Sequence, residues 1–167
     1  MVSPKRAVFL DKDGMLIDNV PPTGDRTGIR LRAHTVDGLL LLAGLGYEII
    51  VASNQPGVAQ GRFPLGALKA VEEHLADLFM ACGLRLADCY WCPHDASGEV
   101  GEHALHCGCR KPQPGLLQAA ALEHGIDLAS SWAIGGEDDV EAGRRAGCRT
   151  LRAGNLLEAA AVIASHP

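Results

Sequence analysis

Residues 7–14, Ala-Val-Phe-Leu-Asp-Lys-Asp-Gly, are the stretch that decides the fold. The four apolar residues predict a short buried strand, and the abrupt change to Asp11-Lys12-Asp13-Gly14 predicts a loop directly after it. A strand with no polar face is typical of a parallel sheet that helices cover on both sides. The stretch therefore predicts an α/β protein with two carboxylates at the end of its first strand.

Strands and helices alternate along the rest of the chain. Short apolar runs predict further strands at 48–52, 88–91, 132–135 and 150–151. Apolar residues at helical spacing predict helices at 36–43, 64–82, 114–124, 139–146 and 156–163, with Asn155 capping the last. This order predicts a Rossmann-like open parallel sheet with helices on both faces. In such a sheet, the polar side chains that follow the strands meet at one edge.

Composition narrows the class of protein. The chain has 167 residues, of which 47% are hydrophobic, so we expect a single domain over 1–167 without a large cap domain. The formal net charge of -5 argues against general nucleic-acid binding, which depends on neutralising phosphates. The N-terminus has no signal-peptide core, and no apolar run is long enough to span a bilayer. We therefore expect a cytoplasmic monomer without a membrane partner.

The cysteines are clustered. Cys92-Pro93-His94 and Cys107-Gly108-Cys109 are separated by a stretch of twelve residues. Three thiolates and one imidazole can complete a closed tetrahedral zinc site, and clustered thiols in a reducing compartment favour metal over disulfides. The spacing predicts a zinc-binding loop at about 92–109, with a loop of incidental thiols as the alternative. The remaining cysteines, which we expect in the core, are Cys82, Cys89 and Cys148.

The carboxylates of Asp11 and Asp13 suggest phosphoryl chemistry. Two carboxylates this close repel each other unless a cation lies between them or one is protonated. One can attack phosphorus while the other passes a proton to the leaving group and then activates water. Mg²⁺ bound between them would neutralise phosphate oxygens. The alternative is a solvated Asp-Lys-Asp-Gly turn.

Two later motifs favour the chemical interpretation. Together with residues 9–14, the stretches 52–55, Ala-Ser-Asn-Gln, and 109–115, Cys-Arg-Lys-Pro-Gln-Pro-Gly, resemble the three phosphate-binding motifs of the haloacid dehalogenase (HAD) superfamily of phosphatases. The resemblance implies that Asp11 is the nucleophile and Asp13 the acid/base. It assigns the other roles as follows: Ser53 and Lys111 bind the phosphoryl group, and Asn54, Gln55 and Arg110 contact the substrate. Arg110 is alternatively a structural ion-pair partner.

The cysteine loop is similar to that of one branch of this superfamily. Its Cys-x-His … Cys-x-Cys-Arg-Lys-Pro pattern is characteristic of the D-glycero-D-manno-heptose 1,7-bisphosphate phosphatases and the related histidinol-phosphate phosphatases. The resemblance implies a structural zinc held by Cys92, His94, Cys107 and Cys109. It also implies a phosphomonoesterase that acts on a small phosphorylated metabolite through an aspartyl-phosphate. Heptose bisphosphate is the favoured substrate and histidinol phosphate the alternative.

The fourth motif departs from the family pattern. Gly136 stands where the resemblance leads us to expect an aspartate that completes the magnesium site, and the segment is one residue shorter than usual. Glu137 or Asp138 can replace it, and we expect Asp138 to join Asp11 and Asp13 as the magnesium ligands. Alternatively, both acids only decorate a helix N-terminus, where negative charge is favoured. The chain would then be a catalytically weakened HAD-fold binding protein.

Overall fold

A five-stranded parallel sheet forms the centre of the molecule. The computed structural model describes residues 4–18 and 28–166. The strand order is β3-β2-β1-β4-β5. The strands are β1 (Ala7–Leu10), β2 (Glu48–Asn54), β3 (Leu86–Cys92), β4 (Trp132–Gly135) and β5 (Arg149–Arg152). The predicted parallel α/β sheet is confirmed.

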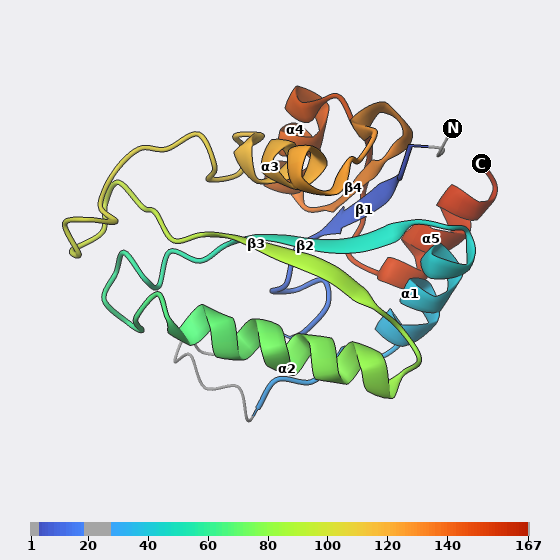
Figure 1. Cartoon of the computed structure of the whole chain (residues 1–167), viewed down its shortest axis with the longest axis horizontal. Coiled ribbons are helices and arrows are strands. Elements are labelled where there is room, and N and C mark those ends of the chain that lie inside the picture. The colour runs from blue at the N-terminus through green and yellow to red at the C-terminus, as the bar shows by residue number, and fades with distance from the viewer. Residues whose placement is uncertain (1–3, 19–27, 167) are drawn as a thin grey trace.

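Helices cover both faces of the sheet (Figure 1). On one face lie α1 (Thr35–Gly44), α2 (Ala67–Ala81) and α5 (Leu156–Ala164), and on the other lie α3 (Gly115–His124) and α4 (Glu137–Ala146). A short 3₁₀ helix, η1 (Leu128–Ser130), precedes β4. None of the helices in the described ranges is long and apolar enough to cross a membrane.

The first strand explains why the fold needs helices on both sides. All four residues of β1 are buried. Val8 and Leu10 point into the core beneath α1, α2 and α5, whereas Ala7 and Phe9 point into the smaller core beneath α3. Successive side chains of a strand alternate between faces, so an uninterrupted apolar run requires two apolar layers.

Two element boundaries differ from the prediction in ways that matter for the site. β2 continues two residues further than expected, because Ser53 and Asn54 pair with Trp91 and Cys92 of β3. α4 begins at Glu137 rather than at residue 139, with Gly136 in extended conformation at its N-cap. In both cases polar residues that the sequence assigns to loops belong to, or directly adjoin, regular structure.

Packing between α1 and α5 is close enough to require a glycine. A Cβ atom on Gly38 of α1 would lie 2.9 Å from backbone atoms of Leu156 and Leu157 in α5. Gly44, at the end of α1, has nothing within 4 Å of such an atom. The asymmetry identifies Gly38 as the point of contact between these two helices.

The two tryptophans occupy different surroundings. Trp132 in β4 is buried, its indole N–H donates to the Tyr47 hydroxyl at 3.2 Å, and the Arg149 guanidinium lies 4.1 Å from its ring centroid. Trp91 in β3 is half-buried, and its indole N–H donates to Glu72 at 3.4 Å. Trp91 immediately precedes the first residue of the cysteine cluster.

The three cysteines expected in the core are not equally buried. Cys89 is buried in β3, and burial raises the pKa of its thiol. Cys82 and Cys148 are only half-buried and pack against the edges of the two cores. Burial raises the pKa of Cys148 to about 12, so this thiol stays protonated at neutral pH.

Candidate active site

The predicted site residues meet at the carboxyl ends of the central strands. Asp11 and Asp13 follow β1, Ser53 lies at the end of β2, and Lys111 comes from the long loop between β3 and α3. Asp139, from the first turn of α4, completes the group. Parallel strands place their carboxyl ends at one edge, which brings Asp11 and Lys111, one hundred positions apart, into contact.

Lys111 lies between two carboxylates. Its buried ammonium nitrogen is 2.6 Å from Asp139 Oδ1 and 3.4 Å from Asp11 Oδ1, and it donates to the Ala52 carbonyl at 2.6 Å. Burial raises the pKa of Asp11; Lys111 opposes this rise and the Asp139 carboxylate adds to it, while the Ser53 hydroxyl favours the charged form. The Asp11 carboxylate is therefore poorly hydrated and faces a fixed ammonium group.

Asp13 is held in place by two donors. The Lys12 ammonium is 2.9 Å from Asp13 Oδ1, and the Gln55 amide donates to Asp13 Oδ2 at 3.0 Å. The same amide also donates to the Ser53 hydroxyl at 3.0 Å. Gln55 is buried, so its contacts fix Asp13 relative to Ser53.

Asn54 fastens the loop that carries Lys111 to β2. Its side-chain amide donates to the Lys111 carbonyl at 2.9 Å, and its carbonyl oxygen accepts from the Lys111 backbone N–H at 2.9 Å. This pair of bonds fixes the backbone of residue 111 as a strand neighbour would. Both of these side-chain hydrogen bonds of Asn54, which was predicted to contact the substrate, are with Lys111.

Arg110 lies at the junction between the cysteine cluster and Lys111. Its guanidinium donates to the His94 carbonyl at 2.9 Å, and its backbone N–H donates to Cys107 Sγ at 3.3 Å. An open cavity of about 380 Å³ lies beside it, lined among others by Asp95, His106, Arg110 and Lys111. The Arg110 side chain thus holds the His94 carbonyl and also lines this cavity.

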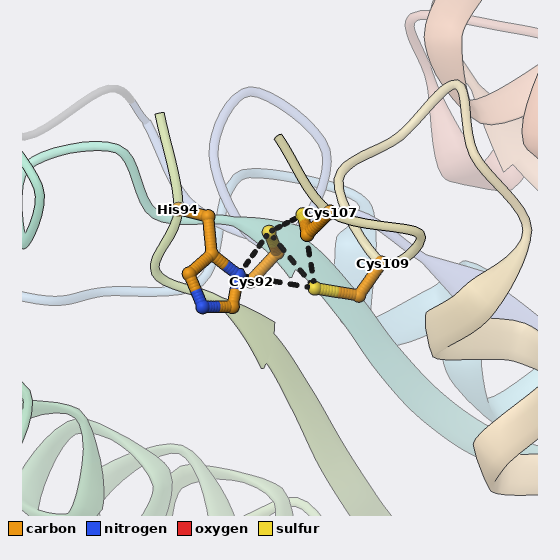
Figure 2. A group of neighbouring side chains, drawn as sticks. All are labelled: Cys92, His94, Cys107 and Cys109. Atoms are coloured by element: carbon orange, nitrogen blue, oxygen red, sulfur yellow. Dashed lines mark hydrogen bonds between the residues drawn. The ribbon is translucent and has the colours of Figure 1, made fainter. Parts of the chain in front are cut away.

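The four predicted zinc ligands converge (Figure 2). The sulfurs of Cys92, Cys107 and Cys109 lie 3.2–3.5 Å apart, and His94 Nδ1 lies 3.4 Å from Cys109 Sγ. All four ligand atoms lie within 4.8 Å of one another. Zinc–sulfur bonds of about 2.3 Å place sulfurs roughly 3.7 Å apart, so small outward shifts would fit this donor set to Zn²⁺.

His103 of the same loop, which lies outside the C-x-H and C-x-C pattern and would be expected to face solvent, is half-buried. Its side chain is 15% exposed, and its ring lies 6.0 Å from that of His94. His106, by contrast, is exposed. The C-x-H pattern distinguishes ligands from neighbours, but it carries no information about which other histidine packs against the cluster.

The fourth motif places Asp139, and neither Glu137 nor Asp138, in contact with the site. Gly136 offers no side chain, and Glu137 and Asp138 are exposed without a hydrogen bond or ion pair to any described residue. The carboxylate of Asp139 lies 2.6 Å from the Lys111 ammonium nitrogen and accepts from the Gly136 backbone N–H at 2.9 Å. Glu137 and Asp138 thus make no hydrogen bond or ion pair with Asp11 or Asp13 among the described residues, and the prediction that Asp138 joins them as a magnesium ligand stays a prediction.

Two residues of the site went unassigned in the sequence analysis. Lys12, predicted to lie in the loop after the first strand, contacts Asp13. Asp139, predicted to begin a helix, contacts Lys111. A signal for Asp139 exists, because an acid in a helix's first turn often bonds the N-cap N–H. Nothing in the sequence signals which way the Lys12 side chain turns.

Comparisons with known proteins show which family the chain is similar to. A sequence model described as HAD-hydrolase-like matches residues 108–153. The chain is 32% identical over 143 residues to the D-glycero-alpha-D-manno-heptose-1,7-bisphosphate 7-phosphatase of Photorhabdus laumondii, covering 85% of this chain and 78% of that protein.

The chain belongs to the family of HAD-like phosphatases.

A second relative in this family supports the same assignment. The D-glycero-beta-D-manno-heptose-1,7-bisphosphate 7-phosphatase of Rhodopseudomonas palustris is 33% identical over 152 residues, which cover 90% of this chain and 84% of that protein. HAD-like phosphatases are phosphomonoester hydrolases, so the chain is assigned to the class of enzymes predicted from its motifs.

Solved structures of HAD-like phosphatases share the fold. A putative HAD-like phosphatase from Mesorhizobium loti superposes with a TM-score of 0.81 at 31% identity and covers 87% of this chain and 70% of that one. The D,D-heptose 1,7-bisphosphate phosphatase of B. bronchiseptica, solved with magnesium and phosphate, also has a TM-score of 0.81, at 20% identity and 98% and 99% coverage.

Proposed function

We propose that this HAD-like phosphatase removes a phosphate group from D-glycero-D-manno-heptose 1,7-bisphosphate. The observation that carries the proposal is Lys111, whose ammonium nitrogen lies 3.4 Å from the Asp11 carboxylate at the edge of the sheet where Ser53 and Asp13 also lie. An ammonium, a hydroxyl and a carboxylate nucleophile are the groups that transfer of a dianionic phosphoryl group requires. The names of the relatives supply the substrate.

In the first step, the carboxylate of Asp11 attacks phosphorus. A bond forms between its oxygen and phosphorus as the bond from phosphorus to the sugar oxygen breaks, and Asp13 gives that oxygen its proton. Lys111 and the Ser53 hydroxyl bind the phosphoryl oxygens as negative charge develops on them. The poor hydration of Asp11, which raises its pKa, makes its charged form more reactive toward phosphorus.

In the second step, water cleaves the aspartyl-phosphate. Asp13, now charged, takes a proton from the water as its oxygen bonds to phosphorus, and the bond to Asp11 breaks. Inorganic phosphate leaves and both carboxylates return to their starting state. Lys12 and Gln55, which hold Asp13 at 2.9 and 3.0 Å, keep the same carboxylate in reach for both proton transfers.

The cysteine cluster would hold Zn²⁺ through Cys92, His94, Cys107 and Cys109. Such an ion supplies a structural crosslink when bound. The residues themselves connect this crosslink to the site, because Cys109 is followed by Arg110 and Lys111 and Arg110 donates to the His94 carbonyl. We propose that the loop at 92–109 belongs to one domain over the whole chain and serves to position Lys111.

Phosphate release from purified protein tests the proposal. We expect release of one phosphate from heptose 1,7-bisphosphate, with the two anomers assayed separately, and its loss in Asp11→Asn. Histidinol phosphate serves as the competing substrate, and hydrolysis of it alone would overturn the heptose assignment. Binding of the bisphosphate without any release, with and without added magnesium, would instead favour the catalytically weakened binding protein that Gly136 suggests.

A further inference from the structure

The side chain of Lys12 is turned inward, toward the acid pair. Only 9% of it is exposed, and its ammonium nitrogen lies 2.9 Å from Asp13 Oδ1. Its backbone N–H donates to Asp11 Oδ1 at 2.9 Å, so the residue contacts both carboxylates. A lysine between two acids in a loop would ordinarily extend into water, where its charge is best solvated. Here it serves instead as a cation within the site.

Position 136 has room for the carboxylate that the chain lacks. Gly136 has φ -79° and ψ -165°, which any residue adopts, and a Cβ atom there would meet only Asp139 Oδ2, at 3.8 Å. Its neighbour Gly135 is different, because its φ is +157° and a Cβ would lie 2.3 Å from Asp139 Oδ2. Glycine is thus required at 135 but not at 136.

The inward-turned Lys12 and the absence of a carboxylate at position 136 both change the net charge of the site. Counted in their charged forms, Asp11, Asp13 and Asp139 contribute three carboxylates, and Lys12 and Lys111 contribute two ammonium groups. The sum is one net negative charge. An aspartate at 136 would double that charge, and removal of Lys12 would do the same. Magnesium binds through carboxylates and gives up its water reluctantly, so its affinity depends strongly on this balance.

We propose that Lys12 and Gly136 together give this phosphatase a low affinity for magnesium, with the Lys12 ammonium supplying beside Asp13 part of the positive charge that a tightly bound divalent ion would supply. The inference rests on the proposed function for the identity of the site. It concerns only how the charge of the acid pair is balanced.

Magnesium binding to substrate-free protein, measured by titration calorimetry and by the rise in melting temperature with added magnesium, tests the inference. Gly136→Asp is expected to bind magnesium at least about tenfold more tightly than the unaltered chain. Gly136→Asn is the matched control. Asparagine has nearly the same size and is an equally good N-cap for α4, but it adds no charge. It should remain within about threefold of the unaltered chain.

Lys12→Met tests the second half of the proposal independently of position 136. Methionine fills the same buried space without the ammonium group, and we expect magnesium to bind about tenfold more tightly. Lys12→Arg keeps the charge and should bind magnesium as the unaltered chain does. A purely structural role for Lys12 predicts that loss of packing weakens magnesium binding or leaves it unchanged.

Two results would overturn the inference. One is magnesium binding by the unaltered chain as tight as that of Gly136→Asp, and the other is no gain in affinity in Lys12→Met. If Gly136→Asp fails to fold, Lys12→Met decides the question alone. Because binding is measured without substrate, a chain that shows these affinities but releases no phosphate refutes the proposed function and supports the inference.

Discussion

At the scale of single residues, the site depends on how Lys111 is held. Its ammonium group contacts two carboxylates and the Ala52 carbonyl, while its backbone forms two hydrogen bonds with Asn54. Both ends of the residue are therefore fixed. A lysine has several freely rotating bonds, so this double attachment removes the disorder that would otherwise weaken a phosphate contact.

Asp11→Asn is expected to abolish turnover and to stabilise the fold at neutral pH. Loss of the nucleophile should lower kcat at least about 10³-fold. Burial raises the pKa of Asp11, so its charged form is disfavoured in the folded state. Protonated Asp11 adds to the free energy of unfolding at pH values below its unfolded-state pKa. This contribution is lost as the pH rises through its folded-state pKa.

Urea denaturation at a series of pH values checks this. The gain in free energy of unfolding of Asp11→Asn over the unaltered chain should be near zero at the acid end and grow as pH rises above 3.8, the ordinary value for this carboxyl. Asp37→Asn, at an exposed site in α1, is the control and should keep full activity. Equal stability of Asp11→Asn and the unaltered chain at pH 7 would contradict the expectation.

At the scale of elements, the sequence predicts each strand and α-helix of the described residues, but not the 3₁₀ helix η1 or the boundaries that shape the site. The run Ala7–Leu10 is predicted to the residue because apolar burial alone defines it. The end of β2 is missed because Ser53 and Asn54 are polar, and only pairing with β3 keeps them in the strand.

The site was predictable to a similar degree. Family motifs identify Asp11, Asp13, Ser53 and Lys111, and ligand spacing identifies the cysteine cluster, because both are patterns along the chain. The contact of Lys12 with Asp13 and the capture of Asp139 by Lys111 depend on side-chain direction across the sheet edge. No pattern along the chain encodes that direction.

The loop at 92–109 should depend on its metal cluster. Cys107→Ser removes one ligand, and we expect a loss of at least about 3 kcal/mol, or roughly 6–12 °C in melting temperature, together with reduced phosphatase activity. Metal analysis should show less bound zinc. Cys82→Ser, at a half-buried position outside the cluster, is the control. Unchanged activity in a zinc-free Cys107→Ser chain would disprove the coupling between the loop and Lys111.

At the scale of the whole molecule, the last helix closes one face of the sheet. α5 packs against α1, so a helix from the end of the chain covers strands from its beginning. Its N-terminus is set by Asn155, whose side chain accepts from the backbone N–H groups of Leu157 and Glu158. The larger core is therefore complete only when residues 156–163 have docked.

Two glycines of α1 test this docking. Gly38→Ala should lower the free energy of unfolding by about 1–3 kcal/mol, because its Cβ would meet the α5 backbone. Gly44→Ala, on the same helix and facing open space, should instead raise it by about 0.5–1 kcal/mol. Thermal and urea denaturation measure both. Similar effects of the two substitutions would mean that α1 and α5 are not tightly packed.

The placement of the two tryptophans gives the molecule two separate optical reporters. Trp132 lies inside the larger core under Arg149, whereas Trp91 adjoins Cys92, packs at the edge of the larger core and donates its indole N–H to Glu72. Their fluorescence therefore arises from different environments. A chain that keeps only Trp91 follows opening of the cysteine loop, and one that keeps only Trp132 follows loss of the whole sheet. Tryptophan fluorescence can thus distinguish opening of the cysteine loop from unfolding of the sheet.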